Sequence, residues 1–217
     1  MNTMIQPRSW SGGRRISSII GKASILTILA VLVGGAIVGR RPGTLPAFTD
    51  RPELIIDESV AVDFQALALQ TWDRFLTVFW TRKDCFGDVY LRAAHTLGSR
   101  AAYDPDSATV TVRVPATAAM LQGALIHEWA HHLEFQCREH EDLRAAFLLA
   151  QGLPGDTPWR MVEKPELAAS AWADVPSEQY AEAVIALVLG GRPIPTGARL
   201  TAGAVQVLEK WAAGNLH

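Results

Sequence analysis

Two histidines and a glutamate occur at a spacing that suits a catalytic metal ion. The segment His127-Glu128-Trp129-Ala130-His131 places the histidines four residues apart. On a helix such residues project from one face a turn apart, so both imidazoles can bind one ion. Glu128 is rotated about 100 degrees from His127, so its carboxylate flanks the ion and can take a proton from an activated water. The pattern therefore predicts a zinc hydrolase site with Glu128 as general base.

A catalytic zinc ion takes three protein ligands, so a third ligand must come from elsewhere in the chain. The metzincin pattern would require glycine at position 134 and histidine at 137, and this chain has Glu134 and Cys137. We favour Glu178, because it and Glu182 share one face of an expected helix and a divalent cation would relieve their repulsion. The pair could instead be a solvated acidic helix start. Acidic residues without such pairing are weaker alternatives for the third ligand, namely Glu141, Glu166 and Asp174.

The HEWAH segment, followed downstream by an E-x-x-A-E helix, resembles the gluzincin branch of the zincin metallopeptidases. The resemblance implies hydrolysis of peptide bonds and a strand meander that leads into the metal helix. It also implies a role for each motif residue: zinc ligands His127, His131 and Glu178, general base Glu128, and Glu182 as the carboxylate that orients the first histidine. The family often has asparagine before the third ligand and serine-aspartate after it. This chain has Ser177 before Glu178, and Ala181 and Glu182 after it.

Other polar side chains near the motif are assigned by residue type alone. A donor for the tetrahedral oxyanion could come from His140, Tyr180 or Arg192. His132 is rotated about 100 degrees from His131, so we expect it on the surface of the helix.

A peptide or protein substrate is expected to lie along the strand that precedes the metal helix. Residues 109–114 alternate valine with polar residues, and an edge strand there could hold an extended peptide by strand addition. Gly123 lies one turn before His127 on the same helix face, at a cost of up to about 1 kcal/mol in helix propensity. An approaching strand or substrate would explain it, and simple tolerance of glycine is an equal alternative.

Two other functions are compatible with the same motif. One is a non-catalytic zinc-binding extracytoplasmic domain, against which Glu128 argues because a structural site needs no base. The other is a zinc hydrolase of a cell-wall amide, since an activated water attacks any suitable amide. The formal net charge of -2 argues against a nucleic-acid partner.

An uncharged apolar run, 23–39, dominates the N-terminal part of the chain. At about 17 residues it is just long enough to cross a bilayer as a helix. Basic residues near its ends favour, by a narrow margin, a cytoplasmic N-terminus. We therefore expect a single-pass cell-membrane protein with a tail and transmembrane anchor in 1–40, a linker in 41–52, and an extracytoplasmic zincin-like domain in 53–217. The alternative is a cleaved signal and a secreted domain.

The body of the chain is expected to form an α+β domain, with a small antiparallel sheet leading into the metal helix and C-terminal helices after it. Strands are expected at 88–94, 100–103 and 109–114, with a hairpin turn at 104–107. Thr117 is a fair N-cap for the helix that carries the motif to about residue 137. Further helices are expected at 62–80, 141–151, 177–189 and 201–213.

Cys85 and Cys137 are the only cysteines. Two are too few for a disulfide scaffold or a four-cysteine zinc site. They could form one bridge if the domain lies outside the cytosol, or remain two unrelated buried thiols.

Overall fold

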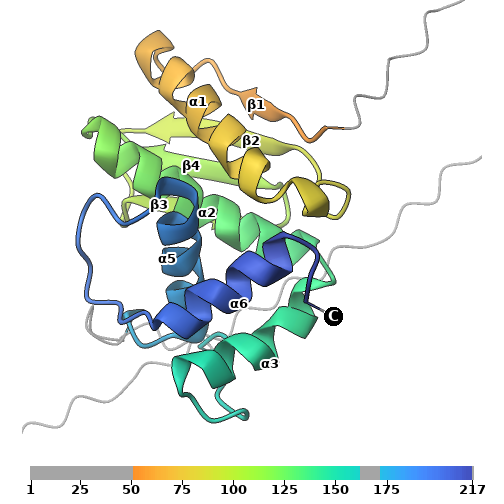
Figure 1. The fold of residues 1–217 in the computed structure, drawn as a ribbon. Helices are drawn as coiled ribbons and strands as arrows, with labels where there is room; N and C mark the ends of the chain where they lie inside the picture. The colour runs from red at the N-terminus through yellow and green to blue at the C-terminus, as the bar shows by residue number, and fades with distance from the viewer. Residues whose placement is uncertain (1–50, 162–171, 217) are drawn as a thin grey trace, which may run out of the picture. The chain divides into compact units, whose positions relative to one another are not determined.

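The computed structural model describes residues 51–161 and 172–216 (Figure 1). The expected tail and transmembrane anchor, 1–40, and most of the linker lie outside the described residues, as does Glu166. Across the described ranges, no helix combines the length and the apolar character needed to cross a membrane.

The described part has the expected α+β composition, with a small sheet and helices. The strands are β1 Leu54–Ile56, β2 Val89–Ala94, β3 Ala101–Asp104 and β4 Thr109–Arg113. The helices are α1 Val62–Val78, α2 Ala118–Gln136, α3 His140–Gln151, α5 Pro176–Leu189 and α6 Ala202–Ala212, with a short 3-10 helix η1 at Trp80–Arg82.

The sheet is mixed, which corrects the expected antiparallel one. Its order is β1-β2-β4-β3, with β1, β2 and β4 parallel and only β3 antiparallel to its neighbour. The chain passes from β2 to the far edge and returns through the β3–β4 hairpin, so β4 is inserted between them. β4 was expected at the edge, but both its sides are hydrogen-bonded, and β3 is the edge strand instead. β1, with three residues, was not predicted because it is too short to show a periodic pattern.

The hairpin turn forms where Asp104, Pro105 and Asp106 predicted it. The Asp104 carboxylate accepts hydrogen bonds from the Asp106 backbone N–H at 3.1 Å and from the Ser107 hydroxyl at 2.6 Å. Such side-chain bonds to nearby donors hold a turn in place and fix the register of the hairpin.

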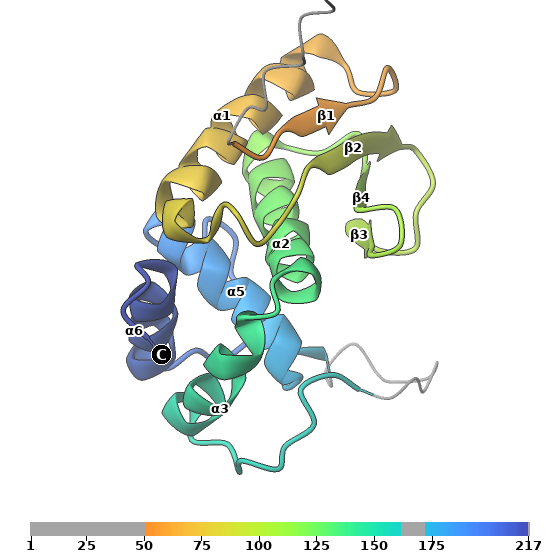
Figure 2. The same cartoon turned by 90° about the vertical axis from the view of Figure 1, so that its right-hand side faces the viewer.

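Helix α2 lies at the centre of the domain, between the sheet and α5 (Figures 1 and 2). The Thr117 side chain accepts the backbone N–H of Met120, which confirms the expected N-cap. Because α1, α5, β3 and β4 all pack against it, α2 buries residues around most of its circumference. Trp129 of α2 is fully buried in the core of the domain, where it packs against Trp72 and Phe75 of α1.

His132 was expected on the surface, and that prediction is wrong because this part of α2 is covered on a second face. The residue is 1% exposed. Its Nδ1 lies 2.9 Å from the Tyr103 hydroxyl, and its Nε2 lies 3.3 Å from the Gly87 carbonyl oxygen. Since a carbonyl only accepts, Nε2 carries the proton and the tyrosine donates to Nδ1. Burial lowers the pKa of His132 to about 4, so the ring is neutral.

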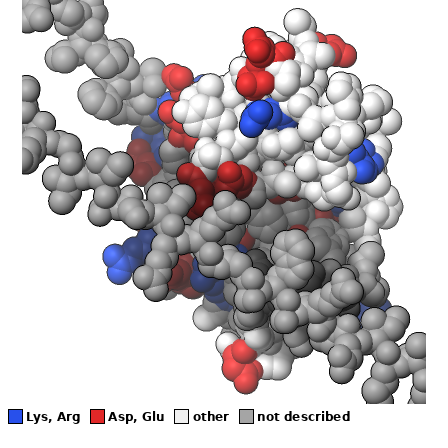
Figure 3. All heavy atoms as spheres, turned by 180° about the vertical axis from the view of Figure 1, so that it is seen from behind, with Lys and Arg blue, Asp and Glu red and all other residues white. Residues whose placement is uncertain are grey.

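The charged surface carries both signs. Figure 3 shows acidic and basic side chains interspersed over the described part of one face, with much uncharged surface between them.

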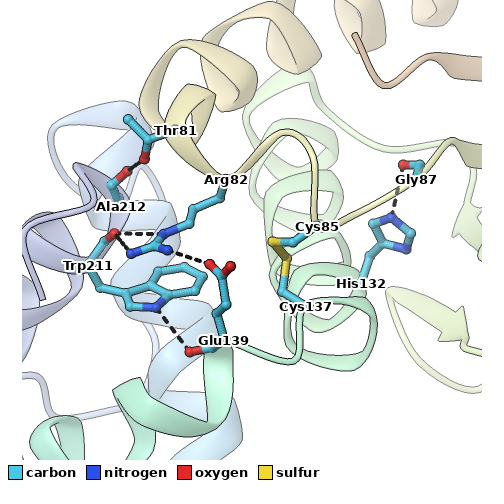
Figure 4. The surroundings of a disulfide bond; sticks show 9 residues. All are labelled: Thr81, Arg82, Cys85, Gly87, His132, Cys137, Glu139, Trp211 and Ala212. Carbon is cyan, nitrogen blue, oxygen red and sulfur yellow. Dashed lines mark hydrogen bonds and ion pairs between the residues drawn. A yellow bond between two sulfur atoms is a disulfide. The ribbon is translucent and has the colours of Figure 1, made fainter. Parts of the chain in front are cut away.

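Cys85 and Cys137 form a disulfide, which decides between the two alternatives left by the sequence. Their Cα atoms lie 4.8 Å apart, and the bond joins the segment after η1 to the C-terminal end of α2 (Figure 4). Next to it, the Arg82 guanidinium donates to the backbone carbonyl of Trp211 and pairs with Glu139. The C-terminal end of α2 is therefore tied to two other parts of the domain.

Candidate metal centre

Three possible ligand atoms from two helices converge at one point. The Nε2 atoms of His127 and His131 on α2 lie 3.2 Å apart. The Oε2 atom of Glu178, in the first turn of α5, lies 3.0 Å from the first and 3.6 Å from the second. These side chains are 12%, 12% and 20% exposed, so the cluster is mostly shielded from water. A metal ion could be held at this cluster.

The spacing of these atoms fits a small tetrahedral ion. Ligand atoms about 2.0–2.1 Å from a tetrahedral zinc ion lie roughly 3.3–3.4 Å from one another. The three measured separations, 3.0, 3.2 and 3.6 Å, bracket that value. Two imidazoles and one carboxylate are also the mixed nitrogen and oxygen donors that zinc accepts, whereas calcium and magnesium prefer oxygen alone.

Hydrogen bonds hold both imidazoles with Nε2 toward the cluster. The Nδ1 atom of His127 lies 3.2 Å from a Glu182 carboxylate oxygen, and that of His131 lies 3.1 Å from Glu134. A carboxylate only accepts, so each Nδ1 carries a proton and each Nε2 can present a lone pair to a metal ion. Glu182 was expected beside the first histidine, and it lies there. Glu134 was not predicted as a partner, although its position three residues after His131 on one helix face could have indicated it.

Glu182 is itself held in place by the guanidinium of Arg192. Its second oxygen accepts hydrogen bonds from Arg192 and from the Thr196 hydroxyl, and its side chain is 1% exposed. Arg192 also donates to the backbone carbonyl of Ile194 at 2.6 Å. The arginine that sequence offered as an oxyanion donor is therefore already engaged in orienting a carboxylate.

Hydrogen bonds within the cluster stabilise its protonated imidazoles, so protons compete with a cation for these side chains. Burial lowers the pKa of His131, but hydrogen bonds to Glu134 and Glu178 outweigh it and raise that pKa to about 10. Burial also lowers the pKa of His127, but its hydrogen bonds to Glu178 and Glu182 outweigh that effect, so the net pKa is raised. Burial raises the pKa of Glu178, yet its bonds to both histidines bring the net pKa far below its usual range. A cation that binds at this cluster must therefore displace protons from the imidazoles.

Glu128 lies beside the cluster without contributing to it. It is 8% exposed, and burial raises the pKa of its carboxyl above the usual value, against the lowering effect of His127 and His131. The backbone N–H of Tyr103, on the edge strand β3, is close enough to stabilise the ionised form. A carboxylate with a raised pKa next to a cation site is suited to accept and return a proton.

Two cavities meet at the cluster. The first, of about 340 Å³, is lined by apolar and charged residues, among them Met120, Gly123, Arg192 and Ile194. The second, of about 550 Å³, is lined by Tyr103, Phe135, Arg160, Met161 and others. Among the described residues, four line both cavities, namely Ala101, His127, Glu128 and Trp172. The candidate metal site thus lies at the middle of a cleft, with the edge strand along one wall.

Gly123 and Trp172 contribute to the shape of this cleft. A Cβ placed on Gly123 would meet no atom of the described residues within 4 Å, so no strand presses on the helix there. The absent side chain instead leaves room in the first cavity. The Trp172 ring stacks on His127 with 5.7 Å between centroids, a contact that the sequence did not predict.

The remaining sequence candidates lie elsewhere. His140 and Tyr180 are fully buried against each other, 4.5 Å between ring centroids, and neither lines the cleft. They are therefore excluded as oxyanion donors, because a substrate could not reach them. Asp174 and Glu141 are exposed and belong to no cluster of possible metal ligands within the described residues.

Comparisons of the chain with protein-family models, curated proteins and solved structures found no match.

Proposed function

We propose that this chain is a zinc-dependent metallopeptidase of the gluzincin kind, with zinc held by His127, His131 and Glu178. The observation that carries the proposal is the convergence of two Nε2 atoms and one carboxylate oxygen within 3.0–3.6 Å of one another, with Glu128 beside them in a cleft. Zinc is favoured over other divalent ions because it accepts imidazole and carboxylate together and keeps a position free for water.

The proposed reaction is attack of water on a peptide carbonyl. When bound, the zinc ion polarises the carbonyl and lowers the pKa of a water molecule toward about 7. Glu128 accepts the proton of the attacking water and returns it to the nitrogen of the leaving amine, as its raised pKa allows. Glu182 keeps His127 in the tautomer that presents Nε2 to the ion.

The substrate would bind along the edge strand β3. Ala101 and Tyr103 of this strand line the cleft, and the free edge of a strand can pair with an extended peptide. We therefore propose that the peptide pairs with β3, and not with β4 as the sequence suggested. The two cavities on either side of the cluster would take side chains that flank the scissile bond.

The Cys85–Cys137 disulfide supports an extracytoplasmic location for the domain, since such bonds persist in oxidising compartments. We keep the proposal that 1–40 anchors the chain in the cell membrane, with secretion after cleavage as the alternative.

The test uses the full chain and its Glu128→Gln variant. We expect about one zinc per chain in both by metal analysis, hydrolysis of casein by the wild type, and loss of at least about a hundredfold in rate in the variant. Hydrolysis should stop on chelation and return with zinc. Activity retained in the variant would remove Glu128 as base, and activity on a cell-wall amide alone would replace the peptidase with an amidase. Zinc without hydrolysis of either substrate would indicate a binding domain.

A further inference from the structure

Glu134 is a buried carboxylate that contacts one of the proposed metal ligands. Its side chain is fully buried. Its two oxygens have separate partners: Oε2 lies 3.1 Å from His131 Nδ1, while Oε1 accepts Trp159 Nε1 and Arg160 Nε, each at 2.6 Å. A buried carboxylate is tolerated only where donors surround it, and here three residues supply them.

The Arg160 side of this arrangement reaches the cleft. Arg160 lines the second cavity, and its guanidinium carbon lies 3.5 Å from the centre of the Phe135 ring, which lines the same cavity. Trp159 comes from the same segment and packs against Phe147 of α3. Glu134 therefore joins the wall of the second cavity to the helix that carries both histidines.

The two histidines are held in the same way, each by a buried carboxylate at Nδ1. Glu182 joins His127 to Arg192, which lines the first cavity. Glu134 joins His131 to Arg160, which lines the second. Each imidazole thus has a buried carboxylate on Nδ1 and an arginine behind that carboxylate.

We propose that Glu134 is a positioning residue for His131, which fixes the tautomer that presents Nε2 to the metal ion and ties this ligand to the wall of the second cavity. This inference rests on the proposed metal site. The alternative role for Glu134 is only to neutralise Arg160 within the fold.

A glutamine at position 134 separates these two roles. Glutamine has nearly the same shape, but it offers one acceptor oxygen and one donor group. With its oxygen toward the Trp159 and Arg160 donors, its NH₂ group faces His131 Nδ1. The imidazole would then have to accept at Nδ1 and carry its proton on Nε2, where the ion must bind.

The test measures Co²⁺ affinity and the visible absorption of bound Co²⁺, which reports its coordination. For Glu134→Gln we expect affinity to fall about 10- to 100-fold and the spectrum to change. The matched control is Glu139→Gln, which removes a carboxylate from a partly exposed arginine pair outside the cleft and should change neither. Arg160→Met removes the arginine but leaves the bonds of Glu134 to His131 and Trp159, so we expect a smaller change in affinity and spectrum than in Glu134→Gln.

The outcomes separate this inference from the proposed function. A wild-type chain that binds neither Co²⁺ nor Zn²⁺ would overturn both. Wild-type binding with the same affinity and spectrum in Glu134→Gln would overturn the positioning role alone, as would equal changes in Glu134→Gln and Arg160→Met. If Glu134→Gln does not fold, nitrogen NMR of the Cd²⁺-loaded wild type decides: His131 should bind through Nε2 with Nδ1 protonated, and binding through Nδ1 would refute the proposal.

Discussion

Loss of the Cys85–Cys137 disulfide should destabilise the domain that contains α2. The bond spans 52 residues of sequence. Closing a loop of that length in the unfolded chain removes conformational entropy worth about 4 kcal/mol at room temperature. For a domain of this size, 1 kcal/mol shifts the midpoint of thermal unfolding by roughly 2–4 °C, so we expect a decrease of roughly 8–16 °C.

The assay is urea and thermal unfolding of the oxidised wild type, the reduced wild type and the Cys85→Ala/Cys137→Ala double variant, all with a chelator present so that metal binding does not contribute. The reduced wild type and the double variant control for the substitutions themselves, and their free energies of unfolding should agree within about 1 kcal/mol. Mass spectrometry after thiol labelling establishes the redox state of each sample.

A fall in the free energy of unfolding of less than about 1 kcal/mol, in a sample shown to contain the bond, would refute this reasoning. It would mean that the segment after η1 and the end of α2 stay close in the unfolded chain without the crosslink, so that closing the loop removes little entropy.

Three further perturbations test the site and its surroundings. Glu178→Ala should lower zinc affinity at least about a hundredfold in a chelator competition, because one of the three proposed ligands is lost, while Asp174→Ala, an exposed neighbour, should leave it unchanged. Burial holds the pKa of His140 at about 3 in the folded protein, below the ordinary value of 6.5, so unfolding takes up a proton and the stabilising contribution present above pH 6.5 is lost as pH falls toward 3. Its ring nitrogens have no hydrogen-bond partner among the described residues, so His140→Phe should fold and show a shallower loss of unfolding free energy between pH 6.5 and 4; an unchanged slope would exclude His140 as its source. Gly123→Leu should fill the first cavity, keep zinc, and slow cleavage of peptides with bulky side chains beside the scissile bond, whereas Gly123→Ala should fold and retain most activity; equal rates in both variants would show that this cavity does not bind substrate.

Local sequence patterns were enough to predict where the helices lie and which residues share a face of one helix. The positions of His127, Glu128 and His131 follow from the 3.6-residue repeat of α2, and Glu178 and Glu182 share a face of α5 for the same reason. The Thr117 cap and the turn at Asp104 also formed as predicted, because each depends on side-chain bonds to donors two or three residues away.

The order and pairing of the strands could not be predicted from local patterns. Alternation in 109–114 shows that a strand is half buried, but it does not show which strands lie beside it. The parallel pairing of β2 with β4, and the edge position of β3, depend on how the chain crosses between strands.

By itself the sequence determined the residue types of the site and their spacing along each helix, because these depend on neighbours within a turn. Only the tertiary structure decided that α5 brings Glu178 to the two histidines, that His132 is buried against Tyr103, and that the two cysteines meet. These outcomes join residues whose separation is set by the packing of α2 against α1, α5 and the sheet. That packing is a property of the whole core, since the face that each helix buries depends on which other elements pack against it.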